Sequence, residues 1–225
     1  MRRSLSLLIT TLFLLFTFLT PGKSQNAFSP KTAIGFTAGY NISSANFESD
    51  LRFATAIDGA FLPGYNAGLL FTYVAPKNLG IQVGLNYTQK GWVIKRASNS
   101  YTRNINYLEL PFLTRIEIGK GDFKLFGLLG PSVSYFYSES ETISIEPGTG
   151  EQVFTAFQQP IENEFDFAIC GGVGFSLSTS IGIFQIHAKA GQSLTNFFQY
   201  KREENGFITS QNQALNVNFG YLIKL

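Results

Sequence analysis

Apolar and polar residues alternate along most of the chain, and the alternation is clearest over residues 214–225. Every odd-numbered residue there is apolar, whereas the even-numbered residues are mostly small or polar: Asn216, Asn218, Gly220 and Lys224, with Leu222 as the exception. Side chains on a β-strand point alternately to opposite faces. The pattern therefore predicts a strand with one apolar face and one polar face.

The same alternation recurs upstream and predicts eight strands in total. They span residues 32–42, 64–73, 80–90, 104–118, 123–138, 165–177, 182–198 and 214–225. Pro111 lies inside the fourth strand and lacks the N–H that a central strand needs, so we expect a local bulge there. Aromatic residues near the strand ends predict a girdle at a membrane interface: Tyr87, Trp92, Tyr107, Tyr135, Tyr137, Phe197 and Phe198.

The connections between these strands alternate between short and long. The short ones are 75–78, 119–122 and 179–181, and the long ones are 43–63, 91–103, 139–164 and 199–213. Outer-membrane barrels have short periplasmic turns and long external loops. The sequence thus predicts an all-β fold, an eight-stranded antiparallel up-and-down transmembrane β-barrel.

A soluble, lipocalin-like barrel with its apolar face inward is the alternative. The predicted strands have about 10 to 16 residues, and a tilted strand needs about 9–11 to cross a bilayer. Charged residues make up only 14% of the chain, against about 25% in a soluble domain. Both observations favour the membrane barrel. The net charge of +2 gives no support for a nucleic-acid partner.

The first 24 residues predict a secretory signal peptide. Met1-Arg2-Arg3 is basic, residues 5–19 are almost all apolar, and small residues follow, so we expect cleavage after Ser24. An uncleaved anchor is the alternative, but the apolar run is shorter than the ~20 residues of a spanning helix. Residues 25–225 then form the barrel domain.

Eight strands enclose a space that side chains nearly fill, so we expect a packed lumen rather than a wide pore. The predicted polar network in the lumen comprises Glu109, Arg115, Glu117, Lys124, Asp166, His187, Lys189 and Lys224. His187, the only histidine, is expected to bond to Asp166 or a neighbour. Ser193 lies six residues further along the strand, about 20 Å away, too far for a Ser–His pair. We predict no cofactor, metal or catalytic site.

The long connections carry charged residues that are candidate external contacts: Lys95, Arg96, Arg103, Glu139, Glu141, Glu146 and Glu151. One interpretation is that the basic and acidic segments attract each other and form a solvated rim. The other is that the basic segment binds lipopolysaccharide phosphates and the acidic segment binds a partner. Residues 142–145 and 152–157 are expected to extend a hairpin above the membrane.

Three motifs carry a resemblance to a known family: NYTQKG at 86–91, YLELPF at 107–112 and GPSVSY at 130–135. Together with residues 166–174 and 193–196 they resemble PorT-type outer-membrane barrels of the Bacteroidetes, in the same order. The resemblance implies an eight-stranded outer-membrane barrel, and some members of that family serve protein secretion by the type IX system.

The expected function is therefore that of a non-enzymatic outer-membrane barrel with a structural or interaction role, which includes a role in secretion. A barrel that binds a small ligand or lipid, and a lipid-modifying enzyme, are the alternatives. The expected partners are outer-membrane lipids and lipopolysaccharide, a secretion-system or surface protein, and the barrel-assembly machinery. The end of the last strand, residues 221–225, resembles the segment that this machinery reads.

Overall fold

The computed structural model describes residues 31–49, 58–96, 99–146, 154, 157–198 and 207–225. The predicted signal peptide and Glu151 lie outside these residues. Among the described residues, no helix is long and apolar enough to cross a membrane.

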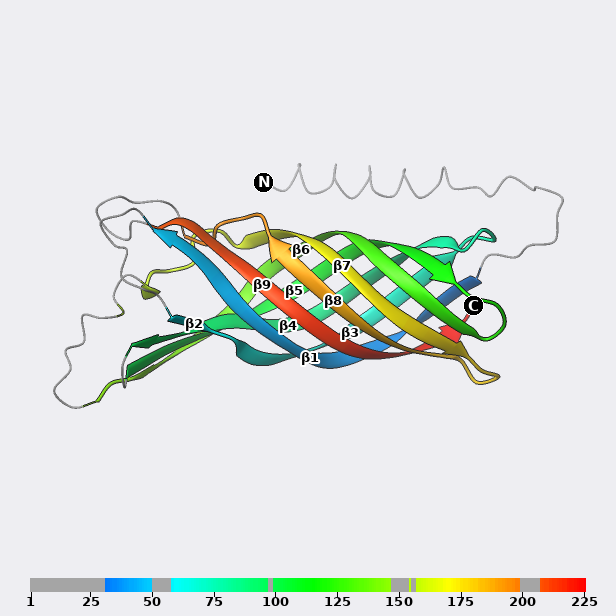
Figure 1. Ribbon diagram of the computed structural model, residues 1–225, viewed down its shortest axis with the longest axis horizontal. Helices are drawn as coiled ribbons and strands as arrows, with labels where there is room; N and C mark the ends of the chain where they lie inside the picture. Colours follow the sequence, from blue (N-terminus) through cyan, green and yellow to red (C-terminus); the bar gives the residue numbers. More distant parts are fainter. Residues whose placement is uncertain (1–30, 50–57, 97–98, 147–153, 155–156, 199–206) are drawn as a thin grey trace, which may run out of the picture.

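Eight long antiparallel strands form a closed ring (Figure 1). They are β1 (Lys31–Ser49), β3 (Leu62–Val74), β4 (Leu79–Arg96), β5 (Asn99–Ile118), β6 (Phe123–Ser144), β7 (Phe165–Ser178), β8 (Ile183–Ser193) and β9 (Phe207–Lys224). Each pairs with the next along the chain, and β9 also pairs with β1, which closes the barrel. A short strand, β2 (Asp58–Ala60), adds to the edge of β4. The predicted fold class is confirmed.

The outward face of the barrel is apolar and the inward face is polar around its middle. Phe36 is 68% exposed, whereas Gln82 and Asn86 are buried inside. This is the arrangement of a barrel in lipid, and the soluble barrel with an inward apolar face is wrong. Leu70 and Leu222 are inward exceptions and pack together with Ala33 near one end.

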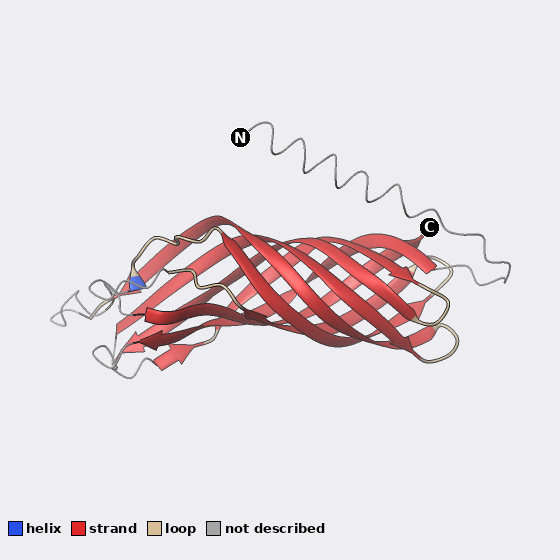
Figure 2. Ribbon diagram, turned by 90° about the horizontal axis from the view of Figure 1, so that it is seen from above, coloured by secondary structure: helices blue, strands red, loops and turns tan. Residues whose placement is uncertain are grey.

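The two ends of the barrel differ (Figure 2). At the end that we call the turn end, tight turns join β3 to β4, β5 to β6 and β7 to β8. Asn78 and Gly121 adopt positive φ angles of 63° and 73° there, a conformation that Asn and Gly tolerate in turns. Lys31 and Lys224, the ends of β1 and β9, lie at this turn end. The opposite end is the loop end.

Several strands extend further at the loop end than the sequence predicts. β4 runs to Arg96 and β5 begins at Asn99, so the long connection predicted over 91–103 is wrong. β1 runs to Ser49, β6 runs to Ser144 and β9 begins at Phe207, whereas β8 stops at Ser193 rather than at 198. The red strands in Figure 2 therefore reach unequally far at the loop end.

The bulge expected at Pro111 is also wrong. The β4–β5 register is the same at Val83↔Phe112 and Asn86↔Glu109, on the two sides of Pro111. Gly84 makes room for the proline ring, because a Cβ there would lie 3.2 Å from Pro111 Cγ.

The bulge between β5 and β6 lies nearer the loop end. Tyr107 pairs with Phe136 and Asn106 pairs with Ser138, so Tyr137 is the extra residue. A bulge of one residue reverses the alternation beyond it. Glu139 and Glu141 therefore share the inward side of the wall with their cross-strand partners, Ile105 and Arg103.

Candidate functional site

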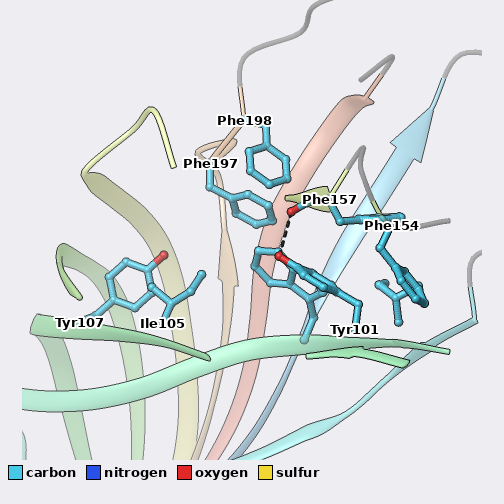
Figure 3. Close-up of a cluster of buried hydrophobic side chains, with 9 residues drawn as sticks. Tyr101, Ile105, Tyr107, Phe154, Phe157, Phe197 and Phe198 are labelled. Carbon is cyan, nitrogen blue, oxygen red and sulfur yellow. Dashed lines mark hydrogen bonds between the residues drawn. The ribbon is translucent and has the colours of Figure 1, made fainter. Parts of the chain in front are cut away.

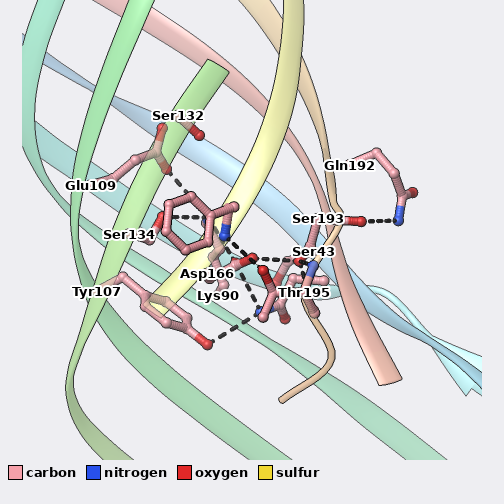
Figure 4. A network of polar contacts seen from close by, with 12 residues as sticks. Ser43, Lys90, Tyr107, Glu109, Ser132, Ser134, Asp166, Gln192, Ser193 and Thr195 are labelled. Carbon is pink, nitrogen blue, oxygen red and sulfur yellow. Dashed lines mark hydrogen bonds and ion pairs between the residues drawn. The ribbon is translucent and has the colours of Figure 1, made fainter. Parts of the chain in front are cut away.

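A buried ion-pair network crosses the middle of the lumen (Figure 4). Glu109 on β5 accepts a hydrogen bond from Lys189 Nζ on β8 and forms an ion pair with Lys90 on β4, with 3.3 Å between Lys90 Nζ and Glu109 Oε2. Asp166 on β7 lies 3.9 Å from Lys90 Nζ. Two ammonium groups and two carboxylates thus balance each other, as buried charges require.

Neutral side chains complete this network. Asp166 accepts hydrogen bonds from Ser193 Oγ and from Asn212 Nδ2, the latter at 3.3 Å. Asn212 also donates to the Tyr107 hydroxyl at 3.2 Å, and Lys90 donates to Ser134 Oγ at 3.3 Å. The voids beside the network measure about 10 and 20 Å³, which is room for about one water molecule each. The middle of the lumen is therefore filled.

Arg115 forms a second network nearer the turn end. Its Nε donates to Glu117 Oε1 at 3.1 Å, and its Nη1 donates to Gln82 at 2.7 Å and to Gln185 at 3.0 Å. Its Nη2 donates to Ser176 Oγ at 3.4 Å. These bonds come from β4, β5, β7 and β8, so the guanidinium group connects opposite parts of the wall.

The structure places the predicted lumen residues in four groups. Glu109, Asp166 and Lys189 meet in the central network, and Arg115 pairs with Glu117. His187 lies beside its cross-strand neighbour Asn218, with 3.4 Å between Nε2 and Nδ2, so of the two expected partners it contacts a neighbour rather than Asp166. Lys124 and Lys224 line the turn end of the lumen, but they join neither ion-pair network among the described residues. They donate to carbonyls of the turns, Gly119 O at 2.5 Å and Thr179 O at 3.0 Å.

Lys90 is the central residue that the predicted network lacked. It ends the predicted strand 80–90 on the polar face. Its even position, in line with Gln82 and Asn86, was the signal that could have placed it inside the barrel.

Above the network, the loop end of the lumen is closed by a cluster that we call the aromatic plug (Figure 3). The plug contains Trp92, Ile94, Tyr101, Ile105, Tyr107, Phe154, Phe157, Phe197 and Phe198, with Phe47 and Phe136 packed against it. The rings of Trp92 and Phe197 stack with centroids 4.7 Å apart. The Tyr101 hydroxyl donates to the Phe157 carbonyl at 3.0 Å.

The plug corrects the predicted aromatic girdle. Trp92, Tyr107, Phe197 and Phe198 are buried inside the barrel. Tyr135 and Tyr137 do lie on its outer surface, where Tyr137 is 65% exposed.

Arg103 holds the plug to the barrel wall. Its side chain is 1% exposed and bonds to Glu139 Oε2 at 2.9 and 2.6 Å, and Glu141 Oε1 lies 3.4 Å away. It also donates to the carbonyls of Phe157 at 3.0 Å and Gln159 at 2.6 Å. Arg103 was predicted as an external contact, and that prediction is wrong because the side chain points into the barrel.

The remaining predicted external residues lie in different settings. Lys95 and Glu146 are exposed at the loop end, and the Glu146 backbone N–H donates to Asn99 Oδ1 at 2.8 Å. The structure describes Arg96 as the last residue of β4 but does not describe its side chain. Phe157 of the segment 152–157, expected to extend a hairpin outward, instead packs inside the plug.

At the turn end, the lumen widens into a cavity of about 330 Å³, which we call the vestibule. Its lining includes Lys31, Lys124, Lys224, Gln185 and the Arg115–Glu117 pair. The vestibule is a hollow that adjoins the Arg115 network.

The remaining nucleophilic side chains, Ser193 and Cys170, make contacts inside the barrel. Ser193 Oγ bonds to the Asp166 carboxylate and to the Thr195 carbonyl. Cys170 is buried against Ser132, with 3.4 Å between Sγ and Oγ. Within the described part of the chain, no three His, Cys, Asp or Glu residues are grouped so that they could hold a metal ion.

Solved structures are similar to this chain to different degrees, and one with a TM-score above 0.5 supports this architecture. The outer membrane protein OprG from Pseudomonas aeruginosa is similar over 88% of this chain and 98% of its own, with a TM-score of 0.56 and 14% identity. The attachment invasion locus protein Ail of Yersinia pestis, in complex with the heparin analogue sucrose octasulfate, aligns over 86% of this chain and 99% of its own, with a TM-score of 0.41 and 14% identity. No curated protein sequence matches the chain significantly.

A family model adds evidence from the sequence itself. The model of the outer membrane protein beta-barrel domain matches residues 24–199, which is more than half of the chain. The protein therefore belongs to the outer membrane protein beta-barrel domain family and is a protein of the bacterial outer membrane.

Proposed function

We propose that this protein is a non-conducting, non-enzymatic outer-membrane barrel with a structural or interaction role. One observation carries the proposal: the lumen is blocked twice in series. The aromatic plug fills its loop end, and the ion-pair network of Lys90, Glu109, Asp166 and Lys189 crosses its middle. Short turns face the periplasm in such barrels, so the turn end is periplasmic and the loop end is external.

The ion-pair network is an electrostatic barrier to the passage of an ion through the lumen. An ion that entered the lumen would have to separate Lys189 from Glu109 and Lys90 from Asp166, and each separation leaves a buried charge without a partner. The voids of about 10 and 20 Å³ each have room for about one water molecule, which is too little for a continuous water path.

Conductance in planar bilayers tests this proposal. We expect the purified, folded barrel to show no single-channel steps, whereas a variant with Trp92→Ala and Arg103→Ala, which removes the centre of the plug, should show short openings. A matched control carries Phe61→Ala and Lys95→Met, because both side chains are exposed at the loop end. Regular channel steps from the unmodified protein would contradict the proposal.

A role in type IX secretion is a narrower form of the proposal. It is supported by the resemblance of residues 86–91, 107–112 and 130–135 to PorT-type barrels of the Bacteroidetes. Deletion of the gene should then reduce the set of exported proteins. An unchanged secretome would refute this narrower form and leave the closed barrel standing.

Contacts outside the membrane are part of the same proposal. Lys95 is exposed at the loop end, where lipopolysaccharide phosphates lie. The barrel-assembly machinery would contact the outward row of β9, which contains Phe219, Tyr221 and Ile223. Crosslinking from position 95 should recover lipopolysaccharide or a surface protein.

The enzyme interpretation has a simple test. His187→Ala should leave the lipid A profile unchanged, because His187 is buried beside Asn218 and Phe126. The ligand-binding interpretation is favoured by the vestibule.

A further inference from the structure

The vestibule is lined by cations that lack carboxylate partners. Lys31 on β1, Lys124 on β6 and Lys224 on β9 contribute to its wall, and none of them takes part in the ion pairs among the described residues. Lys124 and Lys224 each donate to one turn carbonyl. An ammonium group has three N–H donors, so both lysines are held in place with donors to spare.

The charges of the lining do not cancel. Arg115 and Glu117 form a pair at 3.1 Å, and Asp122 is the remaining side-chain carboxylate of the lining. Leu225, the last residue of the printed chain, also lines the cavity and adds its α-carboxylate, so three lysines against these two carboxylates leave one positive charge around a cavity of about 330 Å³. The vestibule therefore favours an anionic ligand.

The floor of the vestibule adds a buried donor without an acceptor. Gln185 is 1% exposed and lines the cavity. Its Oε1 accepts from Arg115 Nη1, which fixes the orientation of the amide, and its Nε2 has no partner among the described residues. A buried donor without a partner is unfavourable, and a bound acceptor would remove that penalty.

We propose that the vestibule is a binding site for a phosphate ester, entered from the periplasm. Lys31, Lys124 and Lys224 supply the charge, and Gln185 Nε2 supplies the donor at the floor. Ser176 and Ser178 also line the cavity, and hydroxyl and ammonium donors together are the usual partners of phosphate oxygens.

The apolar part of the lining indicates what carries the phosphate. Ala33, Leu222 and Ile183 pack together at this end and line the vestibule on the side of β1, β9 and β8. A ligand with a phosphate and a short apolar or glycerol part would contact both kinds of wall. A cavity of this size lies at the lower limit of small-molecule sites, about 300 Å³, so it accommodates a head group rather than a long chain.

Titration calorimetry on the full-length, folded barrel in neutral detergent tests the proposal. The probes are glycerol 3-phosphate and inorganic phosphate, with uncharged glycerol as the blank. We expect both phosphates to bind and glycerol to show no heat of binding.

Two sets of variants separate the vestibule from general attraction to a basic surface. The triple variant Lys31→Met, Lys124→Met and Lys224→Met, and separately Gln185→Leu, should each weaken phosphate binding by roughly tenfold or more. The control variant Lys77→Met with Lys120→Met removes two charges from turns of the same end that do not line the cavity, and it should change affinity by less than roughly threefold. Heat-modifiable gel mobility verifies that each variant is folded.

Nanodiscs identify the source of the phosphate. If a free periplasmic phosphate ester is the ligand, glycerol 3-phosphate binds equally in phosphatidylcholine and phosphatidylglycerol nanodiscs. If a lipid head group is the ligand, phosphatidylglycerol abolishes binding of the soluble probe, and native mass spectrometry finds this lipid on the unmodified protein but not on the triple variant.

Two results would overturn the proposal. One is the absence of phosphate binding by the unmodified protein in both kinds of nanodisc together with no retained lipid. The other is an equal loss of binding in the control variant and the triple variant. The proposal goes beyond the closed barrel and does not depend on it, because a conducting lumen would leave these titrations unchanged.

Discussion

The two ends of the lumen are built from the same eight strands but are closed in opposite ways. At the external end, inward side chains are large and apolar, and Trp92, Tyr101 and Phe197 fill the space. At the periplasmic end, inward side chains leave a cavity of about 330 Å³ with lysines around it. The polar interior of the barrel therefore ends in a packed core on one side and in an open, basic hollow on the other.

The difference follows from what surrounds the wall. Within the membrane, the outward positions meet lipid, so β4 is apolar outside and carries Gln82, Asn86 and Lys90 inside. Beyond the membrane, the outward positions meet water, and β4 then carries Trp92 and Ile94 inside. The alternation keeps its phase while its polarity reverses. The extended strands thus close the external end with a core like that of a soluble protein.

Cations play different roles at the two ends. Arg103 is buried, pairs with Glu139 and Glu141 and holds the segment around Phe157. Lys124 and Lys224 contact only turn carbonyls among the described residues. A positive charge is part of the packing at the external end and is available for a ligand at the periplasmic end.

The largest effect is expected from Trp92→Ala, which removes the centre of the plug. Trp92 is fully buried and contacts the rings of Phe47 and Phe197, so we expect a loss of about 4 kcal/mol in the free energy of unfolding. Circular dichroism during urea unfolding measures it, because Trp92 is the only tryptophan and fluorescence is lost with it. Thiol labelling of Cys170, which lines the central void, should also become faster.

The control for this variant is Phe61→Ala. Phe61 lies at the same end but is 68% exposed, so its removal should change the free energy of unfolding by less than about 1 kcal/mol. Equal losses for the two variants would mean that the external end has no packed core.

Arg103→Met should cost roughly 3 kcal/mol, because it leaves Glu139 and two backbone carbonyls without their donor. Urea unfolding measures the cost, and proteolysis near Phe157 should be faster. Glu139→Gln in the same chain should recover part of the loss, since the carboxylate is then no longer unpaired. If the double variant is as unstable as the sum of the two single variants, Arg103 acts through packing rather than through charge.

Tyr107→Phe tests the boundary between the plug and the ion-pair network. The substitution removes the hydroxyl that accepts from Asn212 Nδ2 at 3.2 Å and keeps the ring that packs against Phe136. We expect a loss of about 1 kcal/mol in urea unfolding. Tyr137→Phe is the control, because its ring is exposed, and it should have no measurable effect. A larger loss in the free energy of unfolding for Tyr137→Phe than for Tyr107→Phe would mean that the stabilising polar contact is not the one made by the Tyr107 hydroxyl.

The sequence was sufficient for the barrel and for three of the four charged residues in the middle of the lumen. Alternation placed Glu109, Asp166 and Lys189 on the inward face, and these three side chains take part in one network. The pairing register of the strands is set by which face is apolar and meets lipid. The alternation along the sequence therefore predicts the fold with little need for tertiary information.

The external end was not predicted because its pattern reverses. Residues 91–103 were interpreted as a loop, since Trp92 and Ile94 continue the inward row of β4 with the opposite polarity. The bulge at Tyr137 also changed the direction of Glu139 and Glu141. Neither the membrane boundary nor a bulge of one residue has a signal in the alternation itself.

The periplasmic end was misread for a different reason. Lys124 and Lys224 have the parity of lumen residues, and the sequence therefore assigned them to the network. Whether a residue has an odd or an even position in a strand predicts the face on which its side chain lies. It does not predict how far along the barrel axis the residue lies, which is its depth. Depth decides whether a lysine finds a carboxylate or only a turn carbonyl, such as Gly119 O or Thr179 O.

The smallest effect is expected from Lys224→Met, and it gives the comparison its sharpest test. Lys224 is exposed and donates to Thr179 O at 3.0 Å, so its removal should change the free energy of unfolding by less than about 0.5 kcal/mol. Arg103→Met, which also replaces a cation by an apolar side chain of similar length, is the matched variant at the other end. If the two substitutions lower the free energy of unfolding equally in urea, charged side chains contribute equally to the stability of both ends. If only Arg103→Met is costly, charge is structural at the external end and free for binding at the periplasmic end.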